Sequence, residues 1–154
     1  MQDALRITAS SIDPGLLALP WSTPLAKWPS ELIVSLPKGL SRHLVRFADL
    51  SGKVVAVKET TDEMARREYE MLGNLARLDV PCVDRVAVIA GRSDADGEPL
   101  AAALVTSHLR FSMPYRALFT RVLRPDTATR LVDALAVLLV RLHNVGFYLS
   151  LIHI

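Results

Sequence analysis

The stretch VVAVK, Val54–Lys58, is the most informative part of the sequence, because it sets one charged side chain in an otherwise apolar segment. Its β-branched residues predict a β-strand. Because successive side chains of a strand point to opposite faces, Ala56 and Lys58 share one face, and Val55 and Val57 share the other. If the first face packs against another element, Lys58 needs an acidic partner there.

The segment that follows, Asp62–Leu78, offers that partner. It contains no proline and opens with capping candidates at Thr61 and Asp62, so we predict a helix. At about 100° per residue, its apolar stripe contains one carboxylate, Glu68. The apolar members of the stripe are Met64, Met71, Leu72, Leu75 and Leu78. A buried carboxylate without a cation is costly, so we expect Glu68 to meet Lys58.

Further strands are predicted around these two segments, which gives an α+β fold with a five-stranded antiparallel sheet and one helix. The other predicted strands are Leu32–Leu36, His43–Leu50, Val83–Ala90 and Leu100–Thr106. The polar stretch Gly91–Pro99 reads as a solvated hairpin loop between the last two strands. The order of the predicted elements is therefore three strands, a helix and two strands.

The two ends of the chain differ from this middle part. Five of the nine prolines lie in the first 37 residues, interleaved with Trp21 and Trp28, which indicates an extended strap without regular structure, held to the core by its tryptophans. Near the other end we predict a short helix around Tyr115–Val122. A second helix, Asp126–Asn144, is so apolar that we expect it to be buried almost all round.

The pairing of a strand lysine with a helix glutamate resembles the small lobe of the protein-kinase-like phosphotransferases. V-A-V-K at Val55–Lys58 resembles the third-strand motif V-A-I-K. Arg67-Glu68, followed by Leu72 and Leu75, resembles the helix whose glutamate holds that lysine. The order of the elements also agrees, and the similarity covers about Leu17 to Tyr148.

This resemblance implies ATP as ligand, together with Mg²⁺. Lys58 would contact the α- and β-phosphates, Glu68 would hold Lys58 in place, and Ala56 would lie against the adenine. The hinge that meets the adenine edge would be formed by Ser107, His108 and Leu109.

The resemblance also assigns a phosphate-covering turn, Pro37–Arg42. Its backbone N–H groups, with Lys38 or Ser41 as further donors, would face the phosphates. The turn departs from the family pattern G-x-G-x-x-G, because it keeps only Gly39.

Several other segments narrow the resemblance to a subfamily. Leu142-His143 and Gly146–Tyr148 resemble the stretch before the catalytic loop in small-molecule and lipopolysaccharide kinases. Together with Leu19–Pro24 and Pro37–His43, they make the chain most similar to an uncharacterised bacterial family described as lipopolysaccharide-kinase-like.

The catalytic-loop Asp of this superfamily, and the Asn and Asp that hold magnesium, do not follow Tyr148. The last six residues, 149–154, resemble the translation of a transposase adaptor used in sequencing libraries, so we expect a truncated fragment with a non-native tail. The expected layout is a strap at 1–30, the small lobe at 31–106, the hinge and first large-lobe helices at 107–148, and the tail.

We therefore expect a fragment of an ATP-dependent kinase whose parent acts on a hydroxyl of a sugar, lipid or small molecule. The fragment itself is expected to be inactive, because positioning and charge neutralisation at the transferred phosphate supply nearly all the catalysis. The alternative is a non-catalytic, pseudokinase-like module that binds a nucleotide or a protein and acts as a regulator.

Composition excludes several other classes. The 154 residues are 51% hydrophobic, which fits one compact domain or part of one. The net charge of +2 is dispersed, which argues against nucleic-acid binding and against a membrane surface. No apolar run is long enough for a membrane span. A single cysteine, Cys82, forms no internal disulfide, and this favours a cytoplasmic protein. The scattered histidines do not suggest a metal site.

Overall fold

The fold is described from a computed structural model, in which residues 4–36, 44–110, 118 and 120–148 are placed well enough to describe. The chain divides into two compact units. The first consists of Met1–Asn74 with Val83–Arg110, and the second of Leu75–Cys82 with Phe111–Ile154.

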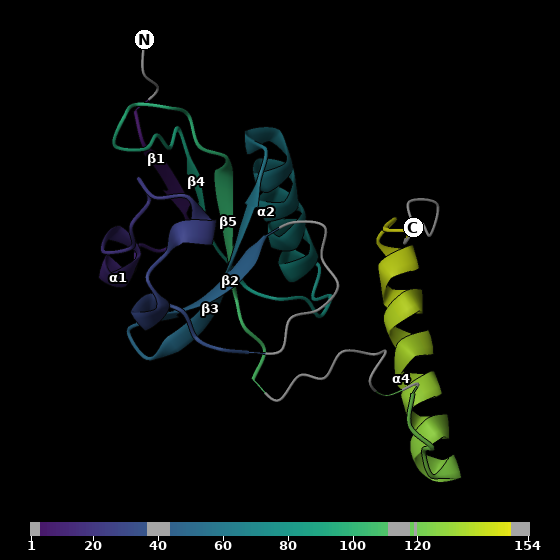
Figure 1. The fold of residues 1–154 in the computed structure, drawn as a ribbon. Helices are drawn as coiled ribbons and strands as arrows, with labels where there is room; N and C mark the ends of the chain where they lie inside the picture. Colours follow the sequence, from purple (N-terminus) through teal and green to yellow (C-terminus); the bar gives the residue numbers. More distant parts are fainter. Residues whose placement is uncertain (1–3, 37–43, 111–117, 119, 149–154) are drawn as a thin grey trace. The chain divides into compact units, whose positions relative to one another are not determined.

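The first unit is built on an antiparallel sheet whose strands, within the described residues, lie in the order β1-β4-β5-β3-β2 (Figure 1). The strands are β1 (Arg6–Ala9), β2 (Val45–Leu50), β3 (Lys53–Thr60), β4 (Arg85–Ala90) and β5 (Ala102–Ser107). Ser51 and Gly52 join β2 to β3 with positive φ angles of 52° and 84°, as tight hairpins require. The predicted α+β class with a five-stranded antiparallel sheet is thus confirmed for the described residues.

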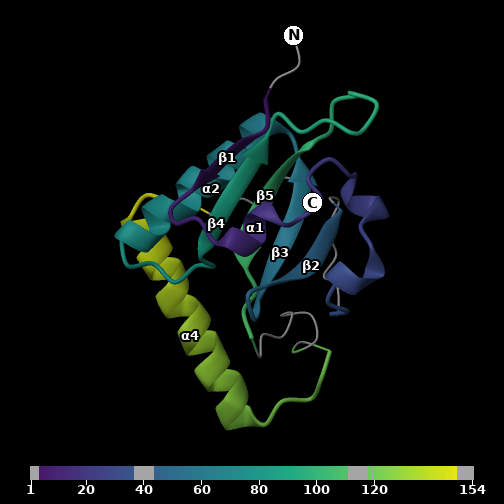
Figure 2. The same ribbon diagram turned by 90° about the vertical axis from the view of Figure 1, so that its left-hand side faces the viewer.

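Helix α2 (Asp62–Arg77) covers one face of this sheet (Figures 1 and 2). The Thr61 hydroxyl accepts a hydrogen bond from the Met64 N–H at 3.3 Å, which caps the first turn. Ala65 and Tyr69 are buried and form a cluster with buried residues of β4 and β5. The helix therefore begins where the sequence predicts.

The buried side of α2 matches the predicted apolar stripe in part, because Leu72 and Leu75 are buried as predicted. Met64 is 48% exposed and Leu78 is 53% exposed, so neither belongs to the core. Besides Leu72 and Leu75, the buried residues of α2 are Ala65, Tyr69 and Gly73. The small residues among them, Ala65 and Gly73, allow the helix to approach the sheet closely.

The N-terminal strap covers the other face of the sheet (Figure 2). Trp21 and Trp28 are both 4% exposed and pack edge to face, with ring centroids 5.3 Å apart. This confirms that the tryptophans hold the strap to the core. The prediction of no regular structure is wrong, because the strap contains β1, the short helix α1 (Pro14–Leu17) and 3₁₀ turns at Leu25–Lys27 and Ser30–Leu32.

A proline begins a helix here instead of preventing one. Pro14 stands at the first position of α1, where its missing N–H is not needed. The carboxylate of Asp13 accepts a hydrogen bond from the Gly15 N–H at 2.8 Å and so caps the turn. The number of prolines alone is therefore a poor predictor of regular structure in this segment.

One predicted strand is also misplaced. In Leu32–Leu36 the structure shows the end of a 3₁₀ turn and a single β-bridge from Ile33 to Ala48. The fifth strand is β1, which pairs along β4 at the edge of the sheet. The Val34 N–H bonds to the Phe47 carbonyl at 2.7 Å, so the segment runs beside β2 only briefly.

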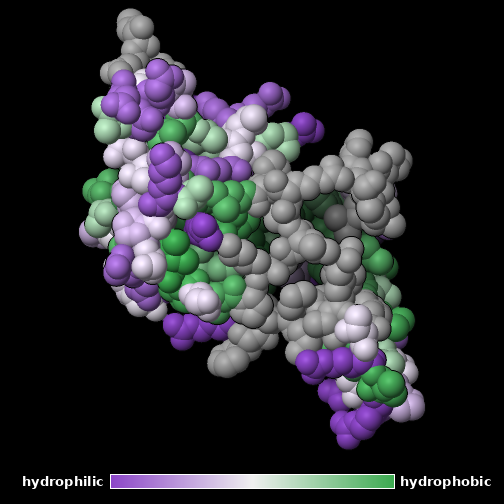
Figure 3. All heavy atoms as spheres, in the orientation of Figure 1, coloured by the Kyte–Doolittle hydropathy of each residue, from purple (hydrophilic) through white to green (hydrophobic). Residues whose placement is uncertain are grey.

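The second unit contains helix α4 (Pro125–Asn144). Burial all round is wrong for this helix: Leu142 is its one buried residue, while Val132, Val137 and Val140 are more than half exposed. Figure 3 shows green, hydrophobic residues along it. Most of the predicted helix Tyr115–Val122 lies outside the described residues.

Among the described helices, none combines the length and apolarity that crossing a membrane requires.

Candidate functional site

Lys58 lies on the α2 face of the sheet, near the end of β3. Its strand partners are Val45 on β2 and Leu104 on β5. The neighbours along the strand, Val55 and Val57, are buried in the cluster under the strap. The predicted alternation of faces along β3 is therefore confirmed. Lys58 itself keeps 25% of its side chain exposed, so a solute can reach it.

Glu68 meets Lys58 from α2. The Lys58 Nζ donates to Glu68 Oε2 at 2.5 Å, and 30% of the Glu68 side chain is exposed. The predicted pairing is therefore confirmed as an ion pair. An ion pair of this exposure contributes about 1 kcal/mol or less to stability, so its main effect is to fix the direction of the ammonium group.

Arg85 on β4 contacts α2 at Tyr69, the residue after Glu68. Its guanidinium lies 4.4 Å from the centre of the Tyr69 ring, and it donates to the Tyr69 carbonyl at 3.3 Å. A Cβ atom on Gly73 would stand 2.2 Å from the Arg85 Cζ. The guanidinium of Arg85 therefore occupies the space that a side chain at position 73 would need, five residues after Glu68.

An apolar and aromatic surface lies beside Lys58 on the same face. Ala56 is half-buried and stands directly opposite Phe47 on β2. The Phe47 ring packs edge to face on His108, with centroids 5.1 Å apart. A flat, apolar ligand could contact this surface while a negative group reached Lys58. The position of Ala56 fits its expected role, which stays a prediction.

The predicted hinge residues partly belong to the sheet. Ser107 is the last residue of β5, and its N–H donates to the Asp84 carbonyl at 2.9 Å. The His108 N–H donates to the Val54 carbonyl at 3.0 Å. Because these two N–H groups already have acceptors, a ligand at this edge would use carbonyls or the N–H of Leu109, which is 52% exposed.

The expected phosphate-covering turn falls outside the described residues. Pro37–Arg42, with Lys38, Gly39 and Ser41, belongs to the undescribed segment 37–43. Its role stays a prediction.

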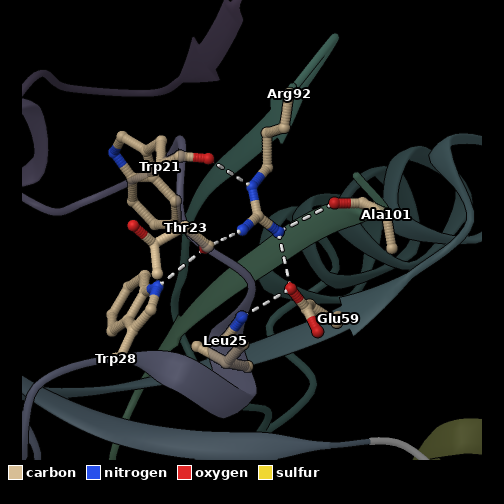
Figure 4. Close-up of polar contacts among 7 residues, drawn as sticks. All are labelled: Trp21, Thr23, Leu25, Trp28, Glu59, Arg92 and Ala101. Carbon is tan, nitrogen blue, oxygen red and sulfur yellow. Dashed lines mark hydrogen bonds and ion pairs between the residues drawn. The ribbon is translucent and has the colours of Figure 1, made fainter. Parts of the chain in front are cut away.

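Sequence reasoning missed the most completely buried charge of the described residues, Arg92, which follows β4 (Figure 4). None of its side chain is exposed, and Nη1 donates to Glu59 Oε1 at 3.0 Å. The other acceptors are backbone carbonyls: Nε donates to Trp21 at 2.9 Å, Nη2 to Thr23 at 2.8 Å and Nη1 to Ala101 at 2.8 Å.

Glu59 completes this cluster, because its Oε1 also accepts the Leu25 N–H at 2.9 Å. The Trp28 indole N–H donates to the same Thr23 carbonyl at 3.2 Å. The cluster therefore ties the strap to β3 and to the start of β5. No local sequence pattern predicts this cluster, because Arg92 stands at the start of the polar stretch that was predicted as a hairpin loop. That stretch does form a turn around Asp94.

Near this cluster, an open hollow of about 450 Å³ lies where β3 ends and α2 begins. It is lined by Glu59–Asp62, Gly91 and Leu100–Ala102, and neither Lys58 nor Glu68 contributes to it. At its rim, the hydrogen bond from Arg66 lowers the pKa of Asp62, and the nearby charges of Arg66 and Arg6 act in the same direction, against the effect of burial.

Within the described ranges, no group of three or more His, Cys, Asp or Glu side chains is placed to hold a metal ion. No family model, no curated protein and no solved structure matches this chain.

Proposed function

We propose that this chain is the nucleotide-binding lobe of an ATP-dependent phosphotransferase of the protein-kinase-like type. The observation that carries the proposal is the ion pair between Lys58 on β3 and Glu68 on α2. A lysine on a central strand, held by the first long helix after that strand, is the arrangement with which such enzymes grip ATP phosphates.

The chemistry of the pair supports phosphate binding. A lysine ammonium has three N–H donors, and Glu68 Oε2 accepts one of them. The remaining donors can bind phosphate oxygens, because both side chains are partly exposed. Glu68 then limits the ammonium to one direction, which lowers the entropy cost of binding.

The surface next to Lys58 is suited to bind the nucleotide's adenine base beside its phosphates. Ala56 leaves a shallow place on the sheet, and the rings of Phe47 and His108 stand next to it. An adenine could stack there while its edge met the end of β5 and Leu109.

In this proposal, Mg²⁺ arrives with ATP, and we assign no residue of the described chain to it. The acceptor of such a phosphotransferase is a hydroxyl of a sugar, lipid or small molecule.

The test is a calorimetric titration of the protein with MgATP. We expect saturable binding that Lys58→Met weakens at least tenfold, because the phosphate contact is lost. Lys53→Met is the matched control, since Lys53 lies on the same strand and is exposed. Circular dichroism checks that each variant is folded. Absence of binding at millimolar MgATP, or equal affinities of the two variants, would refute the proposal.

A further inference from the structure

We infer that Arg92 and Glu59 are positioning residues for the Lys58–Glu68 pair, and that the strap takes part in this positioning. The inference extends the proposed function, since it explains how the proposed phosphate-binding pair is held. We call Arg92, Glu59 and the strap residues that they bind, Trp21, Thr23 and Leu25, the strap clasp.

The strap clasp acts on the corner between β3 and α2. Glu59 follows Lys58 directly, and its side chain points to the strap while that of Lys58 points to α2. Strand β3 ends at Thr60, and α2 begins at Asp62. A single residue, Thr61, therefore joins the strand that carries Lys58 to the helix that carries Glu68.

On the β2 side, few strand hydrogen bonds hold the corner between β3 and α2. The last strand pair between β2 and β3 is Val45 with Lys58. Beyond it, the Glu59 N–H bonds to the Leu44 carbonyl at 3.1 Å, and the Glu59 carboxylate then bonds to the strap. The strap clasp thus holds the end of β3 beyond the last residue pair between β2 and β3.

The clasp is held by several hydrogen bonds that are buried or partly buried. Arg92 makes four hydrogen bonds with no side-chain exposure, and Glu59 is 18% exposed. Breaking a buried pair by removing one partner is much more costly than breaking an exposed one. Glu59 is bonded directly to Lys58 but lies nine residues before Glu68, so a shift of Glu59 displaces Lys58 more than Glu68, and the distance from Lys58 Nζ to Glu68 depends on the clasp.

Arg92→Lys is the test variant. Lysine keeps the positive charge beside Glu59, but it lacks the planar fork that reaches both strap carbonyls and Ala101. Arg130→Lys, the same change at an exposed position of α4, is the matched control. Glu68→Gln is the reference variant, because it shows the reactivity of Lys58 when the partner carboxylate is removed.

The readout is acylation of lysines by an N-hydroxysuccinimide ester, mapped by mass spectrometry well below the melting temperature. An amine must leave its carboxylate to reach the ester, so Lys58, which is paired with Glu68 and 25% exposed, is shielded relative to the exposed Lys53. We expect Arg92→Lys to raise the Lys58-to-Lys53 labelling ratio at least threefold, toward that of Glu68→Gln, and Arg130→Lys to leave it unchanged. Where MgATP binds, its affinity should fall at least fivefold in Arg92→Lys.

An unchanged labelling ratio in a folded Arg92→Lys protein of lower melting temperature would show that the clasp only stabilises the fold, and would overturn the inference. If Arg92→Lys does not fold, Glu59→Gln replaces it, because glutamine still accepts the Leu25 N–H, and the same ratio decides. Labelling needs no nucleotide. A wild-type protein that fails to bind MgATP would therefore refute the proposed function while the ratio still tests the positioning.

Discussion

At the scale of single residues, the chain separates two kinds of ion pair. Lys58–Glu68 is partly exposed, so its contribution to stability is small. In Arg92–Glu59 the arginine side chain is completely buried and each of its three nitrogens donates a hydrogen bond, so removal of one partner should destabilise the whole unit. The first pair is suited to exchange partners with a ligand, and the second is suited to hold the backbone still.

The first pair was predictable, and the second was not. Lys58 stands in a strand of period two and Glu68 in a helical stripe, and both patterns are local. Arg92 binds carbonyls of residues about 70 positions away, which carry no side-chain signature in the sequence. A backbone acceptor looks the same in every residue, so only the folded chain reveals this cluster.

A pH prediction also belongs to this scale. Arg66 Nε donates to Asp62 Oδ1 at 2.9 Å, and this bond lowers the pKa of Asp62 below the ordinary 3.8. A lowered pKa stabilises the fold above the unfolded-state pKa, and this contribution is lost as pH falls through the folded-state pKa. In Arg66→Gln, the Asp62 pKa should rise toward 3.8, as measured by NMR titration of its carboxyl carbon.

Arg67→Gln is the control for this titration, because Arg67 is also exposed on α2. It should leave the titration of Asp62 nearly unchanged. Equal Asp62 titration curves in wild type and Arg66→Gln would contradict the assignment of the pKa shift to Arg66.

At the scale of elements, the seat of α2 on the sheet matters most for the candidate site. The structure places Arg85 between β4 and α2, over the Tyr69 ring and against Gly73. The Cβ of an alanine at 73 would meet only the far end of this flexible side chain. The guanidinium can therefore move aside, and the helix need not.

This geometry predicts a sign change in a double-mutant cycle. Gly73→Ala favours the helix by about 0.5–1 kcal/mol, but it displaces Arg85 from Tyr69, which loses an interaction of about 0.5–2 kcal/mol. Alone, it should be neutral or destabilising. With Arg85→Ala already present, Gly73→Ala should stabilise by about 0.5–1 kcal/mol. Urea unfolding measures all four proteins, and additive effects would contradict the contact.

The elements themselves were predicted where their patterns are local. β3 and α2 lie within two residues of their predicted bounds, because alternation and helical spacing are each complete inside one segment. β1 has four residues and is defined by its pairing with β4, about 80 positions away. Such a short edge strand has no internal pattern strong enough to distinguish it from a loop.

At the scale of the whole molecule, the second unit is the less covered of the two. α4 exposes large apolar side chains on several sides, Val132, Leu135, Val137, Leu139 and Val140 among them. Exposed apolar area of this kind favours self-association. The prediction of an apolar helix is confirmed, while its burial is not found in the described structure.

Polar substitutions should therefore improve the behaviour of the protein. Val132→Lys with Val140→Glu should reduce self-association in sedimentation velocity and change the free energy of unfolding by less than about 1 kcal/mol, because exposed sites tolerate substitution. Leu142→Lys, at the buried position of the same helix, should be clearly destabilising. Equal destabilisation by all three changes would mean that the valines are buried in solution.

The central claim, that Lys58 binds ATP phosphates, is tested most directly by an acyl-phosphate derivative of ATP. When a lysine amine lies beside the phosphates, it attacks the acyl carbon, forms an amide and releases ATP. Peptide mapping should find Lys58 as the main labelled lysine. Excess MgATP should suppress the labelling of Lys58 and leave any labelling of Lys53 unchanged. Uniform labelling of exposed lysines, or labelling of Lys58 that MgATP does not suppress, would contradict the claim.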